Sequence, residues 1–337
     1  MQEVSKSTIN ILAIESSCDD TAAAILQNGK ILCNLVASQK IHEKWGGVVP
    51  ELASRAHQQN IIPVVDAAIK QSGIDKKELS AIAFTTSPGL IGSLIVGTSF
   101  AKSLALGLNI PIIEVNHMQA HILSHFIDEP FPRFPFLCLT VSGGHTSITK
   151  MNNYFDFEVI GKTTDDAAGE AFDKAAKILD LPYPGGPLID EYAKNGNPKA
   201  FQFPTPNVPN LDFSFSGLKT AYLYFVRDKI INDEHFIKNN LNDICASIQF
   251  SIIQHLMKKL IKASEETGIK EIAIAGGVSA NTGLRKAIET EGQLRNWKTH
   301  IPKFEYCTDN AAMIAITGYH KFLAQDFADQ SVSPSAR

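Results

Sequence analysis

The chain has 337 residues, 44% of them hydrophobic and 20% charged, a composition that excludes an intrinsically disordered protein. Its net charge of −4 excludes a strongly basic molecule, so any contact with nucleic acid must use a local basic patch or partner proteins. Five cysteines without a C-x-x-C pair favour buried thiols over a disulfide framework or zinc ribbon. The first ten residues match no targeting segment, which predicts a cytoplasmic protein.

The first part of the chain predicts an α/β sheet. Three strands open it, with Asn28-Gly29 as a hairpin turn between the second and third. The expected elements are strands at 10–14, 21–26, 31–37, 81–85 and 111–115, and helices at 50–70, at 90–107 and after 115. The apolar run 90–108 is interrupted by glycine, serine and lysine, so we expect a buried helix and no membrane span.

A proline-rich segment at 129–135 is the best candidate hinge, and the same strand pattern begins again after it. The later elements are strands at 136–141, 146–150, 155–160, 271–275 and 304–307, helices at 165–179, 282–290 and 310–322, a long helix with apolar residues from Ile244 to Leu260, and an irregular excursion at 196–217. The repeated opening predicts a duplicated fold. We expect domains at 1–132 and 133–337, with the option that helix 309–324 packs on the first.

The turn after the first strand holds two serines and three carboxylates, Glu15, Asp19 and Asp20. Such a turn can contact a phosphate or organise a hydrated cation, or it can be a solvated loop. The residues alone leave both interpretations open.

His117 and His121 are four residues apart on a predicted helix, so their imidazoles share one face and can hold one metal ion. Ordinary surface or core histidines have the same spacing, but the position after a parallel strand favours a ligand site. Asp309 follows the last predicted strand in the second half, with Thr308 as the expected N-cap of the closing helix. A His-His-Asp set joining the two halves would suit Fe(II) or Zn(II).

Two other functions compete for these features. A metallopeptidase of the H-E-x-x-H type is the least favoured, because no glutamate follows His117 to act as the general base. A small-molecule kinase would explain a nucleotide site but would leave both histidines without a role. Three glycine pairs favour a nucleotide held by backbone N–H groups, although each pair by itself is an ordinary turn: Gly143-Gly144, Gly185-Gly186 and Gly276-Gly277.

Seven motifs, spread in order over most of the chain, resemble those of the bacterial TsaD family. They are IESSCDDT at 14–21, NHMQAH at 116–121, VSGGHT at 141–146, GEAFDK at 169–174, YPGGP at 183–187, GGVSAN at 276–281 and CTDNA at 307–311. The resemblance implies an actin/sugar-kinase/heat-shock-ATPase-like (ASKHA) fold of two ribonuclease-H-like domains around a central cleft. It implies a transferase that moves threonylcarbamoyl from threonylcarbamoyl-AMP to N6 of the adenosine beside the anticodon, in tRNAs that read codons starting with A.

The resemblance also implies roles for residues and partners. His117, His121 and Asp309 would hold one divalent metal, Fe(II) or alternatively Zn(II). The adenylate site would comprise Thr140, Val141, Ser142, Gly143, Gly144, Asp173, Gly186 and Asn281, with Asp190 as a further candidate. Asp19 is the candidate for positioning the attacking amine. A metal-free paralogue, TsaB, and a small ATPase, TsaE, would be partners, and helix 50–70 is the expected contact with the paralogue.

Overall fold

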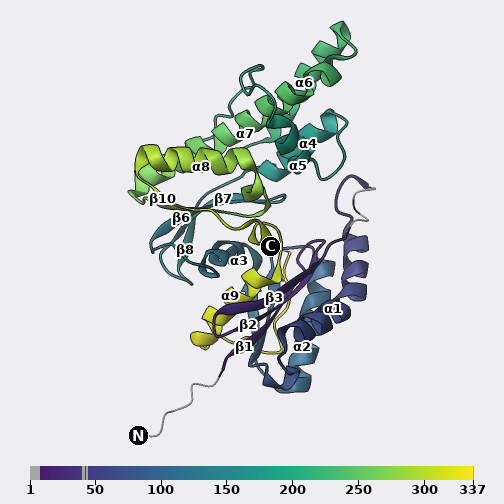
Figure 1. The fold of residues 1–337 in the computed structure, drawn as a ribbon, viewed down its shortest axis with the longest axis vertical. Helices are drawn as coiled ribbons and strands as arrows, with labels where there is room; N and C mark the ends of the chain where they lie inside the picture. The colour runs from purple at the N-terminus through teal and green to yellow at the C-terminus, as the bar shows by residue number, and fades with distance from the viewer. Residues whose placement is uncertain (1–7, 40–41, 43–44, 337) are drawn as a thin grey trace. The chain divides into compact units, whose positions relative to one another are not determined.

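The computed structural model describes residues 8–39, 42 and 45–336 (Figure 1). The first seven residues, where we expect no targeting segment, lie outside the described part. The chain forms two compact units: residues up to 129 together with 309 onward, and residues 130–308. The proline-rich segment therefore begins the second unit. The closing segment, which the predicted boundary grouped with the second domain, belongs to the first unit, and its helix packs on the first sheet as the alternative prediction allowed.

The first unit contains a five-stranded sheet in the order β3-β2-β1-β4-β5. The strands are β1 (Asn10–Glu15), β2 (Thr21–Gln27), β3 (Lys30–Ala37), β4 (Ala81–Ser87) and β5 (Ile112–Asn116). As predicted, β1, β2 and β3 are antiparallel neighbours, while β4 and β5 run parallel to β1. Consecutive strand residues point to opposite faces, so Leu12 and Ile14 pack on one layer of helices and Ile11 on another.

The α-helices in the described residues of this unit are α1 (Pro50–Ser72), α2 (Ile91–Leu108), α3 (His117–Leu123) and α9 (Ala311–Leu323), with short 3-10 helices η2 (Lys76–Glu78) and η3 (Ser124–Phe126). Helices α1 and α2 pack together on one face, and α9 contacts every strand on the other (Figure 1). Within the described residues, α2 alone has the length and hydropathy of a membrane span. It packs against β4, and Ala101 and Ala105 belong to the same core cluster as Ile82 and Phe84, which supports the predicted core helix.

The second unit repeats the topology of the first. Its sheet has the order β10-β9-β6-β7-β8, with β6 (Phe136–Val141), β7 (Thr146–Met151) and β8 (Phe157–Lys162) antiparallel and β9 (Glu271–Ala275) parallel to β6. The predicted last strand at 304–307 is wrong. Phe304–Tyr306 forms the 3-10 helix η5, and the edge strand β10 is Lys298–His300, which pairs in parallel with β9. The chain that leaves α8 reaches the free edge of β9 at residue 298, so the edge is already paired before Pro302.

The helices of the second unit are α4 (Ala168–Ile178), α5 (Gly185–Ala193), α6 (Ser216–Asn232), α7 (Phe236–Thr267) and α8 (Thr282–Arg295), with the 3-10 helix η4 (Gly277–Ala280). The predicted apolar stripe of α7 is buried from Ile244 to Leu260. Helix α6, which follows the irregular excursion, was not predicted. Its buried residues are few, Leu218, Tyr222 and Val226, while Leu223 and Tyr224 are exposed, so the apolar face is hard to recognise in the sequence.

His255 of α7 is a buried, neutral histidine in this core. Its ring packs edge-on against Phe213 and Phe215, and its Nδ1 has no hydrogen-bond partner among the described residues. Burial lowers the pKa of His255 to about 4. Because the unfolded chain binds this proton near pH 6.5, stability is lost as the pH falls from about 6.5 toward 4.

We therefore expect His255→Phe to reduce the acid sensitivity of folding. Between pH 7 and pH 5, its free energy of unfolding should fall by about 1–2 kcal/mol less than that of the unmodified protein, measured by urea unfolding. His235→Gln, at an exposed histidine, is the control and should behave like the unmodified protein. An equal loss of stability in all three proteins would contradict the assignment.

Candidate metal centre and nucleotide-binding turns

His117 and His121 lie on α3, which begins directly after β5. Asn116 ends the strand and caps the helix, because its Oδ1 accepts a hydrogen bond from the backbone N–H of Gln119 at 3.0 Å. One helical turn separates the two histidines, and their ring centroids are 4.7 Å apart. Both side chains are almost completely buried. The end of the strand thus directs two imidazoles into the interior of the first unit.

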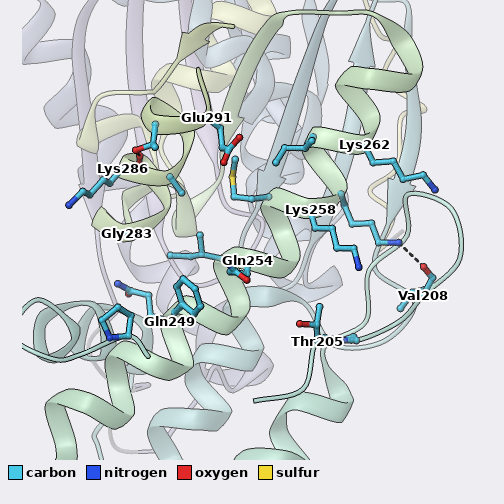
Figure 2. Close-up of a pocket in the computed structure, with 18 of the residues that line it drawn as sticks. Thr205, Val208, Gln249, Gln254, Lys258, Lys262, Gly283, Lys286 and Glu291 are labelled. Carbon is cyan, nitrogen blue, oxygen red and sulfur yellow. Dashed lines mark hydrogen bonds between the residues drawn. The ribbon is translucent and has the colours of Figure 1, made fainter. Parts of the chain in front are cut away.

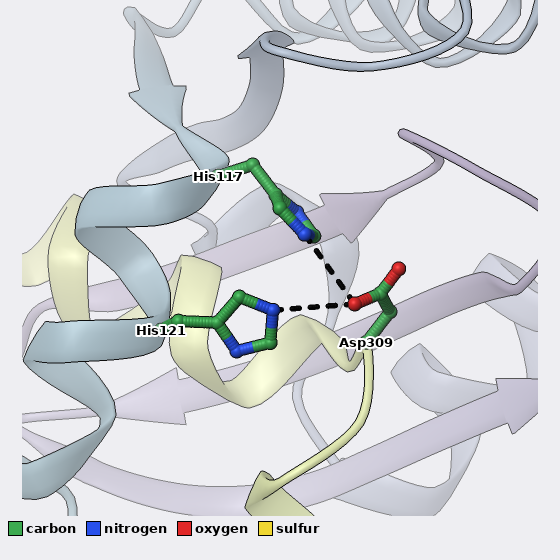
Figure 3. A group of neighbouring side chains, drawn as sticks. All are labelled: His117, His121 and Asp309. Carbon is green, nitrogen blue, oxygen red and sulfur yellow. Dashed lines mark hydrogen bonds and ion pairs between the residues drawn. The ribbon is translucent and has the colours of Figure 1, made fainter. Parts of the chain in front are cut away.

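Asp309 completes the cluster from the other end of the chain. Its Oδ1 lies 3.3 Å from Nε2 of His117 and 3.2 Å from Nε2 of His121 (Figure 3). The predicted N-cap at Thr308 is wrong: Asn310 caps α9 by accepting a hydrogen bond from the backbone N–H of Met313 at 3.0 Å. Asp309 therefore precedes the helix instead of lying in its first turn. It belongs to the same unit as the histidines, so the three side chains do not join the two halves.

The first turn of α9 is fixed by β3. The side-chain oxygen of Asn34 accepts hydrogen bonds from the backbone N–H groups of Ala311 and Ala312, both at 3.2 Å. Two N–H groups at the start of the helix are thereby satisfied by one amide. Asn34 is 277 positions from Ala311 and 278 from Ala312 in the sequence. These hydrogen bonds fix the start of α9 and so the position of Asp309 beside the histidines.

The donor set fits a divalent ion. The three potential ligand atoms lie within 4.8 Å of one another, and two imidazole nitrogens with one carboxylate oxygen suit Fe(II) or Zn(II) and leave coordination positions open. Although burial opposes it, the two histidines hold the pKa of Asp309 well below its usual range. Burial lowers the pKa of His121, which favours the neutral imidazole that a metal requires.

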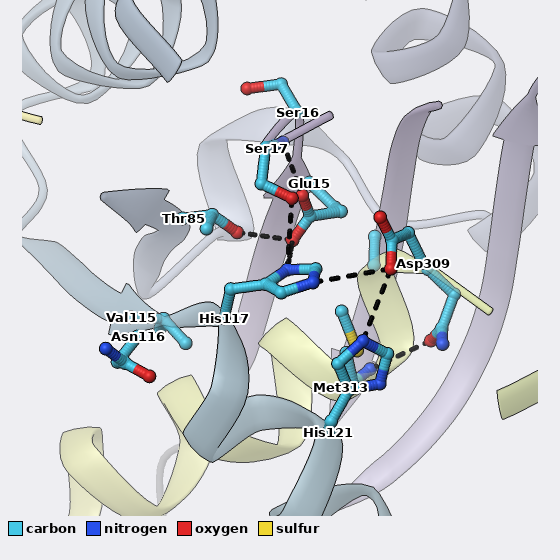
Figure 4. Close-up of polar contacts among 12 residues, drawn as sticks. Glu15, Ser16, Ser17, Thr85, Val115, Asn116, His117, His121, Asp309 and Met313 are labelled. Atoms are coloured by element: carbon cyan, nitrogen blue, oxygen red, sulfur yellow. Dashed lines mark hydrogen bonds and ion pairs between the residues drawn. The ribbon is translucent and has the colours of Figure 1, made fainter. Parts of the chain in front are cut away.

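Glu15, at the end of β1, supports the cluster. This fully buried carboxylate accepts hydrogen bonds from the backbone N–H of Ser17 and the hydroxyl of Thr85, both at 2.5 Å, and its Oε2 lies 3.1 Å from Nδ1 of His117 (Figure 4). A carboxylate at Nδ1 keeps the proton there and leaves Nε2 free to bind a metal. Glu15 was predicted in the first turn, but its contact with His117 was not predicted, because the two residues are 102 positions apart.

The first turn is packed, not solvated. Glu15, Ser16 and Ser17 are buried, and the loop is held to α2, where the Ser16 hydroxyl donates to the carbonyl of Ser93 at 3.2 Å. A Cβ on Gly97 would lie 2.1 Å from the Ser16 hydroxyl, so this approach requires glycine. The solvated-loop interpretation is therefore wrong for the start of the turn.

The end of the turn adds two partly buried carboxylates, Asp19 and Asp20. Burial is the main reason that the pKa of Asp20 is raised to about 7, and the negative charges of Asp19 and Asp309 raise it further. Burial beside the same carboxylates raises the pKa of the Cys18 thiol well above its usual range, so it is not a ready nucleophile. The centre is thus rich in negative charge, which a bound cation would offset.

In the second unit, the predicted turns meet at the carboxyl ends of β6 and β9. Thr140 pairs with Ala275 in register, so the loops that follow these strands are neighbours. A Cβ on Gly276, whose φ is +86°, would lie 2.5 Å from the Val141 carbonyl oxygen. The backbone N–H of Gly169 donates to Ser142 at 3.2 Å, while Gly143 is exposed at the tip of the turn. Gly144 is exposed beside it.

The other predicted adenylate residues are close to helix starts. Asp173 accepts hydrogen bonds on Oδ1 from the backbone N–H groups of Gly185 and Gly186 at 2.8 and 3.2 Å, and these glycines form the first turn of α5, not a loop. Asp190 accepts from the hydroxyl of Thr282 at 2.8 Å. Asn281 caps α8 through the backbone N–H of Leu284 at 2.9 Å. Asp190 and Asn281 therefore hold the start of α8 in place.

Comparisons with known proteins agree on the fold. The chain resembles full-length HypF in its phosphate- and nucleotide-bound form, with a TM-score of 0.63 and 12% identity over 93% of this chain and 46% of that one. It also resembles component A of the (R)-2-hydroxyglutaryl-CoA dehydratase of Acidaminococcus fermentans, with a TM-score of 0.54 and 17% identity over 93% of this chain and 98% of that one. The chain thus has the predicted ASKHA-like α/β fold.

The sequence comparisons are more specific. The family model of TsaD, tRNA N6-adenosine threonylcarbamoyltransferase, matches residues 30–316. The enzyme of that name from Christiangramia forsetii is 66% identical over 99% of both chains, and the one from Porphyromonas gingivalis is 56% identical over 98% of this chain and 99% of its own. This chain is therefore a member of the TsaD family, the tRNA N6-adenosine threonylcarbamoyltransferases, and acts as a transferase on tRNA.

Proposed function

We propose that His117, His121 and Asp309 bind one divalent metal ion, Fe(II) or alternatively Zn(II), and that the transfer reaction depends on it. The observation that carries this proposal is the single carboxylate oxygen of Asp309 placed at nearly equal distances from the two imidazole nitrogens. Such an ion would supply positive charge and open positions for oxygen atoms of the threonylcarbamoyl group. The nearby ionised carboxylate of Glu15 adds to the negative potential that favours a cation.

We propose threonylcarbamoyl-AMP as the donor. In the transfer, the N6 amine of the tRNA adenosine attacks the carbamoyl carbon and forms a new C–N bond. The bond from that carbon to the phosphate oxygen breaks, its electron pair leaves on AMP, and the amine releases one proton. Asp19, at the end of the turn that follows β1, is the candidate for positioning the attacking amine.

For the second unit, we propose contact with the adenylate part of the donor. Gly143 and Gly144 expose backbone at the carboxyl end of β6, where open sheets bind their ligands. Oδ2 of Asp173 has no hydrogen-bond partner in the described part of the chain and is available for a ribose hydroxyl. Thr140, Val141, Ser142, Gly186, Asp190 and Asn281 complete this proposed set.

We further infer that the chain works in the cytosol with the metal-free paralogue TsaB and the ATPase TsaE. The support is a set of exposed apolar side chains on α1 and α2. Ile62 is 64% exposed, Ile95 49% and Leu106 71%, although both helices bury their other faces on the sheet. A protein partner would remove these side chains from water.

Replacing a metal ligand tests the first proposal. We expect His121→Ala to lose bound metal and to slow transfer roughly a hundredfold or more, because an open-site metal contributes several kcal/mol. Metal is measured by mass spectrometry of the protein, and transfer by nucleoside mass spectrometry of unmodified tRNA with threonylcarbamoyl-AMP. His235→Gln, at an exposed histidine, is the matched control. Full metal content and activity in His121→Ala would refute the assignment.

Glu15→Gln tests the buried support without changing side-chain size. Loss of the carboxylate at Nδ1 of His117 should weaken metal affinity about 10- to 100-fold while the protein remains folded. Competition with a chromophoric chelator measures the affinity. Glu114→Gln, at an exposed position of β5, should leave it unchanged. Equal affinities in the two variants would show that Glu15 does not orient the ligand.

The partner surface is tested by Ile62→Glu. A charge in an apolar interface should weaken binding of the paralogue at least about tenfold, measured by titration of the purified proteins. Leu294→Glu on α8, at a side chain 72% exposed in the second unit, is the control and should bind normally. If Ile62→Glu bound as tightly as the control, the interface would lie elsewhere.

A further inference from the structure

The second unit contains a groove with a volume of about 1150 Å³ between α7, α8 and the irregular segment 198–210 (Figure 2). None of its lining residues belongs to the metal cluster or to the proposed adenylate set. Phe250, Ile253 and Met257 of α7 form an apolar floor, with Pro206 on the facing segment. The exposed amide of Gln254 lies beside this floor and can both donate and accept hydrogen bonds.

The facing wall is held in place by a buried lysine. The ammonium of Lys259, on α7, donates hydrogen bonds to the backbone carbonyls of Val208 and Asn210 at 2.7 and 2.8 Å. Lys259 is only 5% exposed, so it is part of the wall and is not available to a ligand. The groove is therefore preformed, with an ordered segment on one side and two helices on the other.

The rim carries positive charge that the protein itself does not neutralise. Lys258 on α7 and Lys286 on α8 are exposed, and within the described residues their ammonium groups make no ion pair or hydrogen bond. The two carboxylates of the rim, Glu265 and Glu291, both pair with Arg295, at 2.9 and 2.7 Å. The lysines thus face the groove without competing acidic partners.

We propose that this groove binds an unpaired stretch of the tRNA substrate. RNA offers the two features that the groove requires: phosphates for Lys258 and Lys286, and flat base faces for the apolar floor at Phe250. The choice of RNA follows from charge complementarity in a chain whose family acts on tRNA although its own net charge is −4. The groove supplies the local positive surface that such a chain needs. This proposal does not depend on the metal.

The test is tRNA binding by the purified full-length protein at several salt concentrations. The double variant Lys258→Ala/Lys286→Ala should bind unmodified tRNA about tenfold more weakly. The slope of log affinity against log salt should become less steep by about 1.4, because each lost contact with a single-strand phosphate removes roughly 0.7. Lys219→Ala/Lys238→Ala is the control. It removes the same charge from exposed positions elsewhere in the unit, where the described residues provide no ion-pair partner, and it should change neither quantity. Equal losses in both double variants would overturn the proposal.

The apolar floor provides a second readout. Phe250→Ala should weaken tRNA binding roughly 5- to 100-fold with an unchanged salt slope, because stacking of a base is lost and no charge is removed. Gln254→Glu, at an exposed position, keeps the fold and should weaken binding by placing a negative charge beside the phosphates. If neither variant weakened binding, RNA would not enter the groove.

AMP distinguishes an RNA groove from a site for a small nucleotide. Calorimetric titration of AMP should give the same affinity for the unmodified protein and for Lys258→Ala/Lys286→Ala. A clear drop in AMP affinity in the double variant would mean that the groove holds a mononucleotide, and the proposal would be wrong. Unchanged metal content in all variants separates this result from a failure of the metal proposal.

Discussion

The burial of one carboxylate organises the first unit. Glu15 is fully buried, and a buried carboxylate without partners would cost several kcal/mol. Its partners come from three separate segments: the turn after β1 through Ser17, β4 through Thr85, and α3 through His117. Satisfying this charge therefore fixes the loop, the sheet and the histidine helix at the same time. Although burial opposes it, His117 lowers the pKa of Glu15, so the carboxylate stays ionised.

The two units share one topology but present different residues at the equivalent turn. In the first unit, the turn between β1 and β2 lies beside β4, which is parallel to β1. In the second unit, the turn between β6 and β7 lies beside β9, which is parallel to β6. In the first unit this turn is packed and presents carboxylates around the histidines. In the second, Gly143 and Gly144 leave backbone exposed at the corresponding turn. Duplication thus provides two equivalent positions, and side-chain composition decides whether a position suits a cation or an anionic ligand.

Much of the fold followed from periodic patterns in the sequence. Alternating and apolar runs identified both sheets except β10, which is too short, at three residues, to give a clear pattern. The 304–307 segment has a strand-like composition, but the edge of β9 is already paired with residues 298–300, which come earlier in the chain. The closing helix was placed within one residue at each end, whereas its cap was misassigned because threonine and asparagine are both good N-caps. In the structure the cap is Asn310, whose side chain is buried, with 1% exposed.

The grouping of the three candidate ligands was predictable from the sequence, but the contacts that support them were not. The spacing of His117 and His121 and the motif around Asp309 suggested a common cluster, and the structure brings these side chains together. The contacts of Glu15 with Thr85 and of Asn34 with α9 join residues 70 and 277 positions apart, and no local pattern reports them. The expectation that the cluster joins the two halves failed for the same reason. Packing of α9 on the first sheet is a long-range property of the fold.

The division of the chain has a consequence for its synthesis. Residues 130–308 interrupt the first unit, so the ribosome completes the whole second unit before Asp309 and α9 emerge. Until then, the first sheet lacks the helix that covers one of its faces, and the two histidines lack their carboxylate. A nascent or prematurely terminated chain can form the histidine helix, but it cannot assemble the three-residue cluster. Full assembly of the centre is thereby limited to complete chains.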